Sequence, residues 1–164
     1  MKIRYSLFDS RFGELLAIAR DDRLAGLYFV GQKDQPDLRA LEREGGLRDD
    51  DWPVLAETRR QVAEYEAGSR VEFELPIELA GTEFQRRVWA QLLRIPWGQT
   101  RSYAQVAHGA GSPRAVRAVG AAIGRNPVSV VVPCHRVVGS DGSLTGYTGG
   151  LERKRALLRH ERVL

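Results

Sequence analysis

The chain has 164 residues, 43% hydrophobic and 28% charged, which is typical of one or two small globular domains with a hydrophobic core. No apolar run approaches the roughly 20 residues that cross a membrane, and the N-terminus lacks the apolar segment of a signal peptide. A single cysteine excludes an intrachain disulfide framework and suits a reducing compartment, so we expect a cytoplasmic, intracellular protein.

Charge is distributed unevenly along the chain. Residues 1–80 hold 12 Lys and Arg and 17 Asp and Glu, whereas residues 81–164 hold 13 and only 4, so the net charges are −5 and +9. A half so poor in carboxylates suits a polyanion such as DNA, because each phosphate that a cation neutralises releases counterions. A basic surface that only maintains solubility would have the same composition.

The acidic half predicts an α/β domain over residues 1–76. Alternating apolar residues and turn signals predict an antiparallel meander of three strands, Lys2–Asp9, Gly13–Arg20 and Leu24–Val30. The stretch 32–51 predicts a loop with a short helix at Asp37–Glu44, and Leu55–Ala67 predicts a second helix. This half has no His, no Cys and no Gly-rich phosphate loop, so we expect a structural role.

Residues 77–81 predict a linker to a second, mostly helical domain over residues 82–164. Capping residues and Gly or Pro stops predict three helices here: Glu83–Ile95 after Thr82, Tyr103–His108 after Ser102, and Arg114–Ile123 after Ser112. Two short helices joined by a Gly-containing turn are a helix-turn-helix pattern. On a basic half-chain this pattern indicates DNA binding.

The helix after the turn is small and apolar apart from Arg117. A helix that reads base edges in the major groove normally carries several long polar side chains. Small residues instead allow close approach to the DNA backbone, which predicts minor-groove binding with little sequence preference. A buried helix with Arg117 reaching out to solvent is the alternative.

The only cysteine stands in the stretch VVPCHRVV, residues 131–138. A cysteine with the ordinary pKa of about 8.5 is mostly thiol at neutral pH, and a neighbouring base or cation activates it. In a strand His135 would point away from Cys134, so a turn at Pro133 is needed to bring the two together. Glu161 is a candidate to orient the imidazole. A passive core residue is the alternative for Cys134.

Downstream, Tyr147 stands in the glycine-flanked stretch GYTGG, where it is placed to close over a planar ring and to offer its hydroxyl group. The stretch 151–161 predicts an amphipathic closing helix rich in Arg and Lys. With one Cys and 3 His, a cysteine–histidine zinc site is not expected.

Four stretches across residues 81–161 resemble the O6-alkylguanine-DNA alkyltransferases: GTEFQRRVWAQLLRIPWGQTRSYAQVA, RAVGAAIGRNP, PCHRVV and GYTGGLERKRALLRHE. The resemblance implies an RNase H-like α/β domain followed by a mostly α domain with a winged-helix-like helix-turn-helix. It implies a monomer that binds double-stranded DNA through the minor groove without a cofactor. Such a protein flips O6-alkylguanine out of the helix and transfers the alkyl group irreversibly to its own cysteine; O4-alkylthymine is a further expected substrate.

The resemblance also implies roles for individual residues. Cys134 accepts the alkyl group, and His135 acts as the base through water with support from Glu161. Tyr147 bonds the guanine and helps to protonate it, while the Thr148 amide lies near O6. Carbonyl groups of Cys134 and Val137 accept from the exocyclic amine.

On the DNA side, the resemblance implies that Arg117 fills the gap left by the flipped base and that Tyr103 presses on the adjacent phosphate. Asn126 ties the helix-turn-helix to the active-site turn. Further DNA contacts are expected at Ser112, Arg114, Ala115, Ala118 and Arg125. The zinc-binding pattern of some relatives is missing, so no metal is expected.

Two other functions remain open. Alkyltransferase-like proteins keep the DNA-binding surface but lack the cysteine, and the presence of Cys134 argues against that class. A thiol hydrolase with a Cys-His-Glu triad is the second alternative. The sequence argues against it, because it has no signature of a substrate pocket apart from the DNA-binding pattern.

Overall fold

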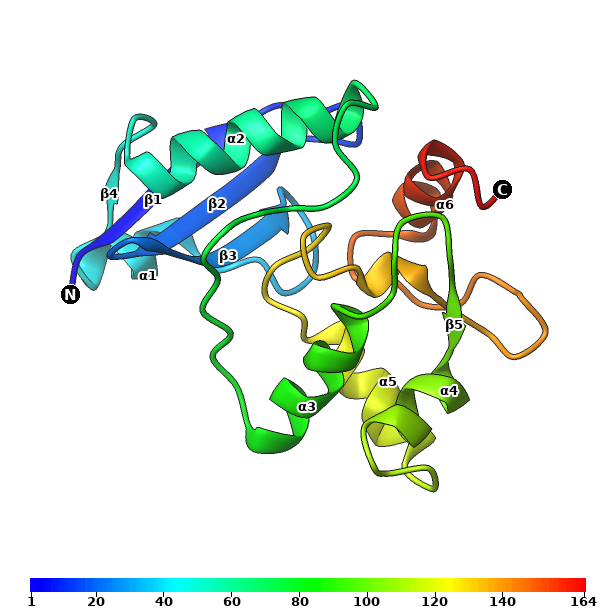
Figure 1. The fold of residues 1–164 in the computed structure, drawn as a ribbon. Helices are drawn as coiled ribbons and strands as arrows, with labels where there is room; N and C mark the ends of the chain where they lie inside the picture. The colour runs from blue at the N-terminus through cyan, green and yellow to red at the C-terminus, as the bar shows by residue number, and fades with distance from the viewer. The chain divides into compact units, whose positions relative to one another are not determined.

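A computed structural model describes all 164 residues, which form two compact units, Met1–Leu79 and Ala80–Leu164. Figure 1 labels the helices α1–α6 and the strands β1–β5 of the two units. None of the helices has the length and apolar character that a membrane span requires.

The sheet of the first unit contains the three predicted strands, β1 (Ile3–Phe8), β2 (Leu15–Arg20) and β3 (Arg23–Phe29), paired as an antiparallel meander. A fourth strand, β4 (Leu47–Arg48), pairs parallel with β1 and gives the order β3-β2-β1-β4. We expected a loop there, and that prediction is wrong. Two exposed residues at a sheet edge carry no alternating pattern, so the sequence gives no signal for them.

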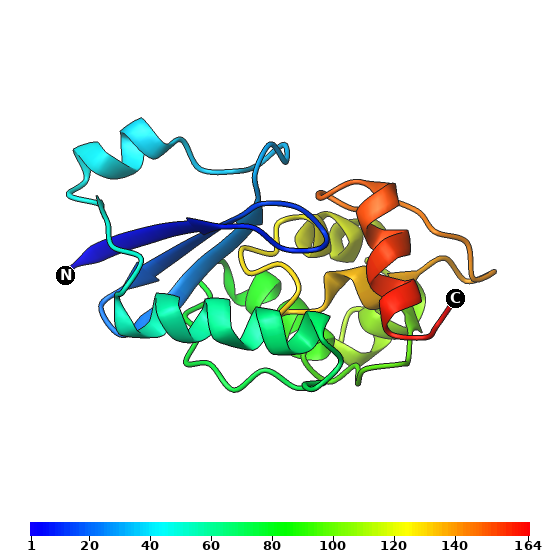
Figure 2. The same ribbon diagram turned by 90° about the horizontal axis from the view of Figure 1, so that it is seen from above.

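Two helices cover the sheet, as Figure 2 shows, with α1 (Leu38–Arg43) and α2 (Pro53–Glu66) on opposite faces. Alternation along β2 explains the two layers. Leu16 and Ile18 pack in one cluster with Leu41 of α1, whereas the intervening side chains point to the other face, where α2 packs. Both predicted helices are confirmed within two residues at each end.

The last residues of the first unit extend along β3. The Leu24 amide donates to the Pro76 carbonyl at 2.8 Å, and the Glu78 amide donates to the Leu24 carbonyl at 2.9 Å. Ile77 therefore forms a parallel bridge with Leu24.

The second unit contains four helices, α3 (Glu83–Leu92), α4 (Tyr103–Gly109), α5 (Val116–Gly124) and α6 (Leu151–His160). Thr82 and Ser102 cap α3 and α4 as predicted, each in a reciprocal pair with a glutamine three residues later. Buried Trp89 joins α3 to α5, because its indole nitrogen donates to the Ala122 carbonyl at 2.8 Å. The α4–turn–α5 unit confirms the expected helix-turn-helix.

The predicted start of α5 is wrong. We expected Ser112 to cap a helix with Pro113 at its first position that runs Arg114–Ile123, but α5 begins at Val116 and its N-cap residue, Ala115, makes no side-chain cap bond. The Ala115 amide instead donates to the Ser112 carbonyl at 2.9 Å, which closes a separate turn before the helix. Likewise α3 ends at Leu92 rather than Ile95, since the amides of Arg94 and Ile95 donate to carbonyls three residues back instead of four, ahead of Pro96.

Between α5 and α6 the chain forms a short 3-10 helix, η1 (Cys134–Arg136), and the strand β6 (Val137–Val138). β6 pairs parallel with β5 (Arg101–Ser102), a contact that the sequence did not predict. The overall class, a mixed α/β unit followed by a mostly α-helical unit, agrees with the prediction.

Candidate active site

The turn that the sequence required at Pro133 is present. Pro133 precedes η1 with φ −82° and ψ 64°, and its carbonyl accepts from the Arg136 amide at 3.0 Å. Because a 3-10 helix has three residues per turn, His135 is not forced to the opposite face from Cys134 as it would be in a strand. Both side chains are buried.

Asn126 braces the segment that leads to this turn. Its side-chain amide donates to the Val132 carbonyl at 2.8 Å, and its oxygen accepts from the Val128 amide at 3.0 Å. Between these two contacts Val130 has a φ of 70°, a left-handed conformation that is rare for a β-branched residue. Such a conformation costs about 1–3 kcal/mol and persists only where surrounding contacts hold it.

Behind η1, the Glu161 carboxylate binds two neighbouring side chains. His135 Nε2 lies 2.8 Å from Glu161 Oε2. Arg136 donates from Nε to Oε1 at 2.7 Å and from Nη2 to Oε2 at 2.9 Å, and its Nη1 donates to the Ile95 carbonyl at 2.7 Å. All three side chains are buried. The His135–Glu161 contact was expected, but the role of Arg136 in it was not.

The charges of this cluster follow from its contacts. Burial alone would raise the pKa of Glu161, but the hydrogen bonds from His135 and Arg136 outweigh it and lower that pKa. Burial lowers the pKa of His135. A neutral imidazole beside an ionised carboxylate carries its proton on Nε2, so Nδ1, which is buried without a hydrogen-bond partner in the protein, is an acceptor.

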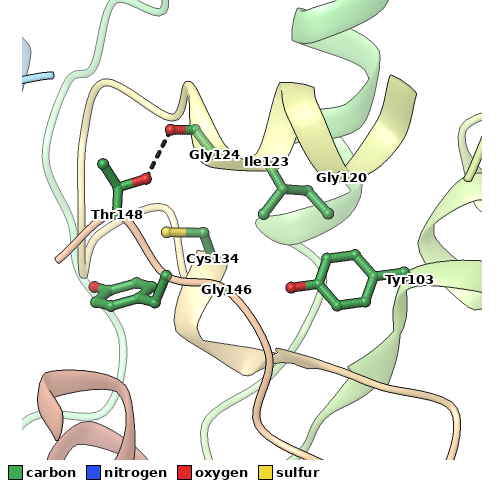
Figure 3. A pocket seen from close by; sticks show the side chains of 8 residues that line it. Tyr103, Gly120, Ile123, Gly124, Cys134, Gly146 and Thr148 are labelled. Atoms are coloured by element: carbon green, nitrogen blue, oxygen red, sulfur yellow. Dashed lines mark hydrogen bonds between the residues drawn. The ribbon is translucent and has the colours of Figure 1, made fainter. Parts of the chain in front are cut away.

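Cys134 lines a pocket of about 220 Å³. Residues from α4, α5, η1 and the loop before α6 form it: Tyr103, Gly120, Ile123, Gly124, Cys134, Gly146, Tyr147 and Thr148. In Figure 3 the hydroxyl group of Tyr103 is directed toward the side of the pocket where Cys134 and Gly146 lie. Of the predicted site residues, Tyr103, Cys134, Tyr147 and Thr148 therefore meet in one cavity.

Side-chain hydrogen bonds attach the loop before α6 to the helix-turn-helix. The Thr148 hydroxyl donates to the Gly124 carbonyl at 2.8 Å, as drawn in Figure 3. The Tyr103 hydroxyl donates to the Thr145 carbonyl at 2.9 Å. The loop that carries Tyr147 is thus held at both α4 and the end of α5.

Val137 does not line this pocket. It is fully buried in β6, where it pairs with Arg101, and its amide donates to the Cys134 carbonyl. That carbonyl, a predicted acceptor for the guanine amine, therefore already accepts one hydrogen bond within the turn.

The predicted DNA-contact residues lie in and around α5. Arg114, Arg117, Ala118 and Arg125 are exposed, whereas Ser112 and Ala115 are half-buried. The core side of α5 consists of Val119, Ala122 and Ile123. The alternative, a buried helix from which Arg117 reaches out to solvent, is therefore wrong, because Val116 and Ala118 of α5 are exposed as well.

Lys154 of α6 is a pocket-side residue that the sequence analysis missed. It is fully buried, and its ammonium group donates to the carbonyls of Thr145 at 2.9 Å and Gly146 at 3.2 Å. The sequence pattern predicts it only as one of the basic residues of an amphipathic helix. Its spacing is the signal that was overlooked, since residues three and four positions later, Leu157 and Leu158, are core leucines on the same face.

Fold and site together define a helix-turn-helix protein that presents its one cysteine in a pocket beside a buried His–Glu pair. The family model "6-O-methylguanine DNA methyltransferase, DNA binding domain" matches residues 83–163, and "6-O-methylguanine DNA methyltransferase, ribonuclease-like domain" matches residues 3–79. The chain belongs to this family, whose members transfer the alkyl group to a cysteine of their own and are consumed in doing so.

Relatives match over nearly the whole chain. A methylated-DNA--protein-cysteine methyltransferase of Mycolicibacterium paratuberculosis is 46% identical over 98% of this chain and 93% of its own. The constitutive enzyme of Bacillus subtilis is 44% identical over 97% and 95%. The crystal structure of Mycobacterium tuberculosis OGT in complex with DNA superposes with a TM-score of 0.88 at 42% identity, covering 97% of this chain and 92% of that one. The expected ribonuclease-like and DNA-binding domains are thereby confirmed.

The structure brings no group of three or more His, Cys, Asp or Glu side chains together in an arrangement that would hold a metal ion.

Proposed function

We propose that this protein repairs DNA by accepting the alkyl group of O6-alkylguanine on Sγ of Cys134. The thiolate attacks the alkyl carbon, a C–S bond forms, the C–O6 bond breaks, and the bonding electrons pass to the guanine. The thiol proton ends on the guanine, so the products are an S-alkyl cysteine and an intact base. A thioether has no ready route back to a thiol, so each molecule acts once.

The observation that carries the proposal is the position of Cys134 in a pocket beside an imidazole that is neutral and oriented. Neutral His135 is held through Nε2 by Glu161, which leaves Nδ1 to accept the thiol proton, directly or through water. A nucleophile, a base and a carboxylate that orients the base are the usual arrangement for activating such a group.

Tyr147 and Thr148 are the proposed contacts to the base. Both line the pocket, and Thr148 is fixed by its hydroxyl bond to Gly124. We assign to Tyr147 the role of proton donor, which neutralises the charge on the departing guanine. The Thr148 amide is assigned a contact near O6. The carbonyls of Cys134 and Val137 remain proposed acceptors, with Val137 the weaker case because it lies outside the pocket lining.

An alkylated base has to leave the helix to reach this pocket, and unstacking costs a few kcal/mol. We assign to exposed Arg117 the filling of the gap and to Tyr103 pressure on the adjacent phosphate. The small exposed residues of α5 support minor-groove binding with little sequence preference. We further propose that Asn126 positions the active-site turn. Further proposed DNA contacts are Ser112, Arg114, Ala115, Ala118 and Arg125. We also propose that the protein acts as a monomer and accepts O4-alkylthymine as a second substrate.

The test is the intact mass of the protein after incubation with duplex DNA that contains O6-methylguanine. We expect one added CH2, located at Cys134 by peptide mapping and absent from Cys134→Ser. Tight binding without an adduct would favour a pure binding module, and an adduct on another residue would remove Cys134 from its assigned role.

A further inference from the structure

Lys154 is a buried cation beside the pocket to which the transfer reaction as described assigns no task. It is fully buried, whereas Arg155, the next residue of α6, is exposed. Removing an ammonium group from water is costly unless partners compensate it. The contacts of Lys154 must therefore offset the cost of burying its charge.

Its partners are neutral. The ammonium group donates to the carbonyls of Thr145 and Gly146 at 2.9 and 3.2 Å and lies 5.9 Å from the centre of the Tyr103 ring. No carboxylate forms an ion pair with it. The Thr145 carbonyl also accepts from the Tyr103 hydroxyl, so two side chains from different helices hold the same peptide group.

These two carbonyls belong to the loop that closes the pocket. Gly146, Tyr147 and Thr148 line the cavity, and Thr145 directly precedes them. Gly146 has a φ of 54°, a left-handed conformation in which the loop turns. Lys154 therefore bonds the backbone at the turn that leads into Tyr147.

The charge of Lys154 acts on the reacting groups. Burial lowers the pKa of Lys154 to about 8, and a charged Cys134 opposes that shift. Interaction between two charges is reciprocal, so the ammonium group favours the thiolate as much as the thiolate favours the ammonium. The same positive charge contributes to the lowered pKa of His135, after burial as the main cause.

Among the groups of η1 and α4 that face this region, none supplies an uncompensated positive charge; on α6, Arg153, which is only partly buried, donates to the Gly149 carbonyl at 3.0 Å. On η1, His135 is neutral and Arg136 is paired with Glu161 from the end of α6. On α4, burial raises the pKa of Tyr103, which keeps its phenol neutral at physiological pH. Lys154 is thus a fully buried cation beside the pocket of Cys134, and no carboxylate forms an ion pair with it.

We propose that Lys154 is a positioning residue with two tasks, holding the Thr145–Gly146 backbone over the pocket and favouring the thiolate of Cys134 by its unbalanced positive charge. The inference rests on the proposed role of Cys134 as the nucleophile. Its tests use thiol chemistry and loop exchange, neither of which needs DNA or guanine.

The charge is tested by the rate at which iodoacetamide alkylates the protein as a function of pH, since Cys134 is the only thiol. At neutral pH Lys154→Met should react about tenfold more slowly than the wild type, with its pH profile moved to higher pH. Lys154→Arg should recover most of the rate. Arg155→Met, which removes a charge from the exposed face of the same helix, is the matched control and should follow the wild type.

A profile of Lys154→Met that coincides with the wild-type profile would overturn the electrostatic task. If that variant fails to fold, the electrostatic task is tested on the wild-type protein instead. Blocking Cys134 with iodoacetamide removes the thiolate, so the pKa of Lys154, followed by NMR of its ¹⁵N-labelled ammonium group, should fall. An unchanged Lys154 titration would overturn the claim equally.

The loop task is tested by hydrogen exchange of the amides of residues 145–148. Exchange should be faster in Lys154→Met and close to the wild type in Lys154→Arg and Arg155→Met, while α3 keeps its protection as the control for folding. Unchanged exchange in Lys154→Met would contradict the loop task. If the thiol and exchange results hold while DNA yields no adduct, the proposed function fails and the assignment of Lys154 stands.

Discussion

Arg136 and Glu161 form a buried bidentate ion pair, with Nε to Oε1 at 2.7 Å and Nη2 to Oε2 at 2.9 Å. The same Oε2 is bonded to the His135 ring, so one carboxylate carries both the arginine and the imidazole. Because Arg136 also donates to the Ile95 carbonyl, this pair fixes the end of α6 against the segment after α3. The orientation of His135 therefore depends on Arg136, which acts through Glu161 and does not line the pocket.

Removing Arg136 leaves Glu161 buried without its cation. Breaking a buried pair from one side typically costs about 3–5 kcal/mol, so we expect Arg136→Met to lower the free energy of unfolding by about that much. Urea denaturation gives the value. Arg159→Met, on the exposed face of α6, should change stability by less than about 0.5 kcal/mol and serves as the control. Similar losses of unfolding free energy in the two variants would mean that the Arg136–Glu161 pair does not stabilise the fold.

Folding stability should fall below neutral pH because of His135. Burial lowers its pKa in the folded state below the ordinary value of 6.5, so in acid the unfolded chain binds a proton that the folded chain does not. This contribution is fully present above pH 6.5 and is lost as pH falls through the folded pKa. Unfolding free energies from neutral pH to about pH 5 should therefore decline more steeply in the wild type than in His135→Gln. Parallel curves would show that His135 does not titrate abnormally.

Glu161 adds a second window at lower pH. Its pKa is lowered in the folded state, so its contribution is present above its ordinary value of 4.5 and is lost as pH falls through the folded pKa. In Glu161→Gln the loss of stability below pH 4.5 should be smaller than in the wild type, which acid titration of the circular dichroism signal would measure. An equally steep acid transition in both proteins would contradict the lowered pKa.

Arg117→Ala separates base flipping from chemistry. The residue is exposed on α5 and does not line the pocket, so its loss should slow methyl transfer from duplex DNA far more than reaction with free O6-benzylguanine. Rates of adduct formation with the two substrates give the comparison. Arg155→Ala is the control for loss of a surface charge. Equal slowing on both substrates would remove Arg117 from the flipping step.

Gly120→Ala should narrow the pocket without unfolding the protein. A Cβ at this position would lie 3.9 Å from the nearest ring carbon of Tyr103, an ordinary contact. Alanine stabilises a helix interior by about 0.5–1 kcal/mol relative to glycine, so thermal stability should not fall. We expect reaction with free O6-benzylguanine to slow more than reaction with free O6-methylguanine. An equal effect on both bases would place the alkyl group away from Gly120.

Local patterns were sufficient for much of the fold. Alternation predicted β1 to β3, and the capping residues Thr82 and Ser102 predicted the starts of α3 and α4. The two-residue strands β4, β5 and β6 were beyond this reasoning, because partners distant in sequence determine them. The start of α5 failed for a related reason, since the Ser112 carbonyl closes a turn where a cap was expected.

The site divides in the same way. Cys134, His135, Glu161 and Tyr147 are candidates from the sequence itself, whereas Asn126 follows only from the resemblance to a known family. The sequence pattern predicts Lys154 as one of the basic residues of an amphipathic helix, because long basic side chains are rarely buried, and it predicts no role for Arg136. Both positions depend on tertiary contacts: Arg136 pairs with Glu161, 25 positions away, and Lys154 bonds the carbonyls of Thr145 and Gly146.

The central claim, irreversible transfer to Cys134, is tested most directly by counting methyl groups with substrate in excess. Duplex DNA with a radiolabelled O6-methylguanine is incubated with a known amount of protein, and the label bound to protein and the guanine restored in DNA are followed together. We predict that both rise to one equivalent of protein and stop, with no label on Cys134→Ser. Guanine restored beyond one equivalent, or labelled Cys134→Ser, would contradict the account.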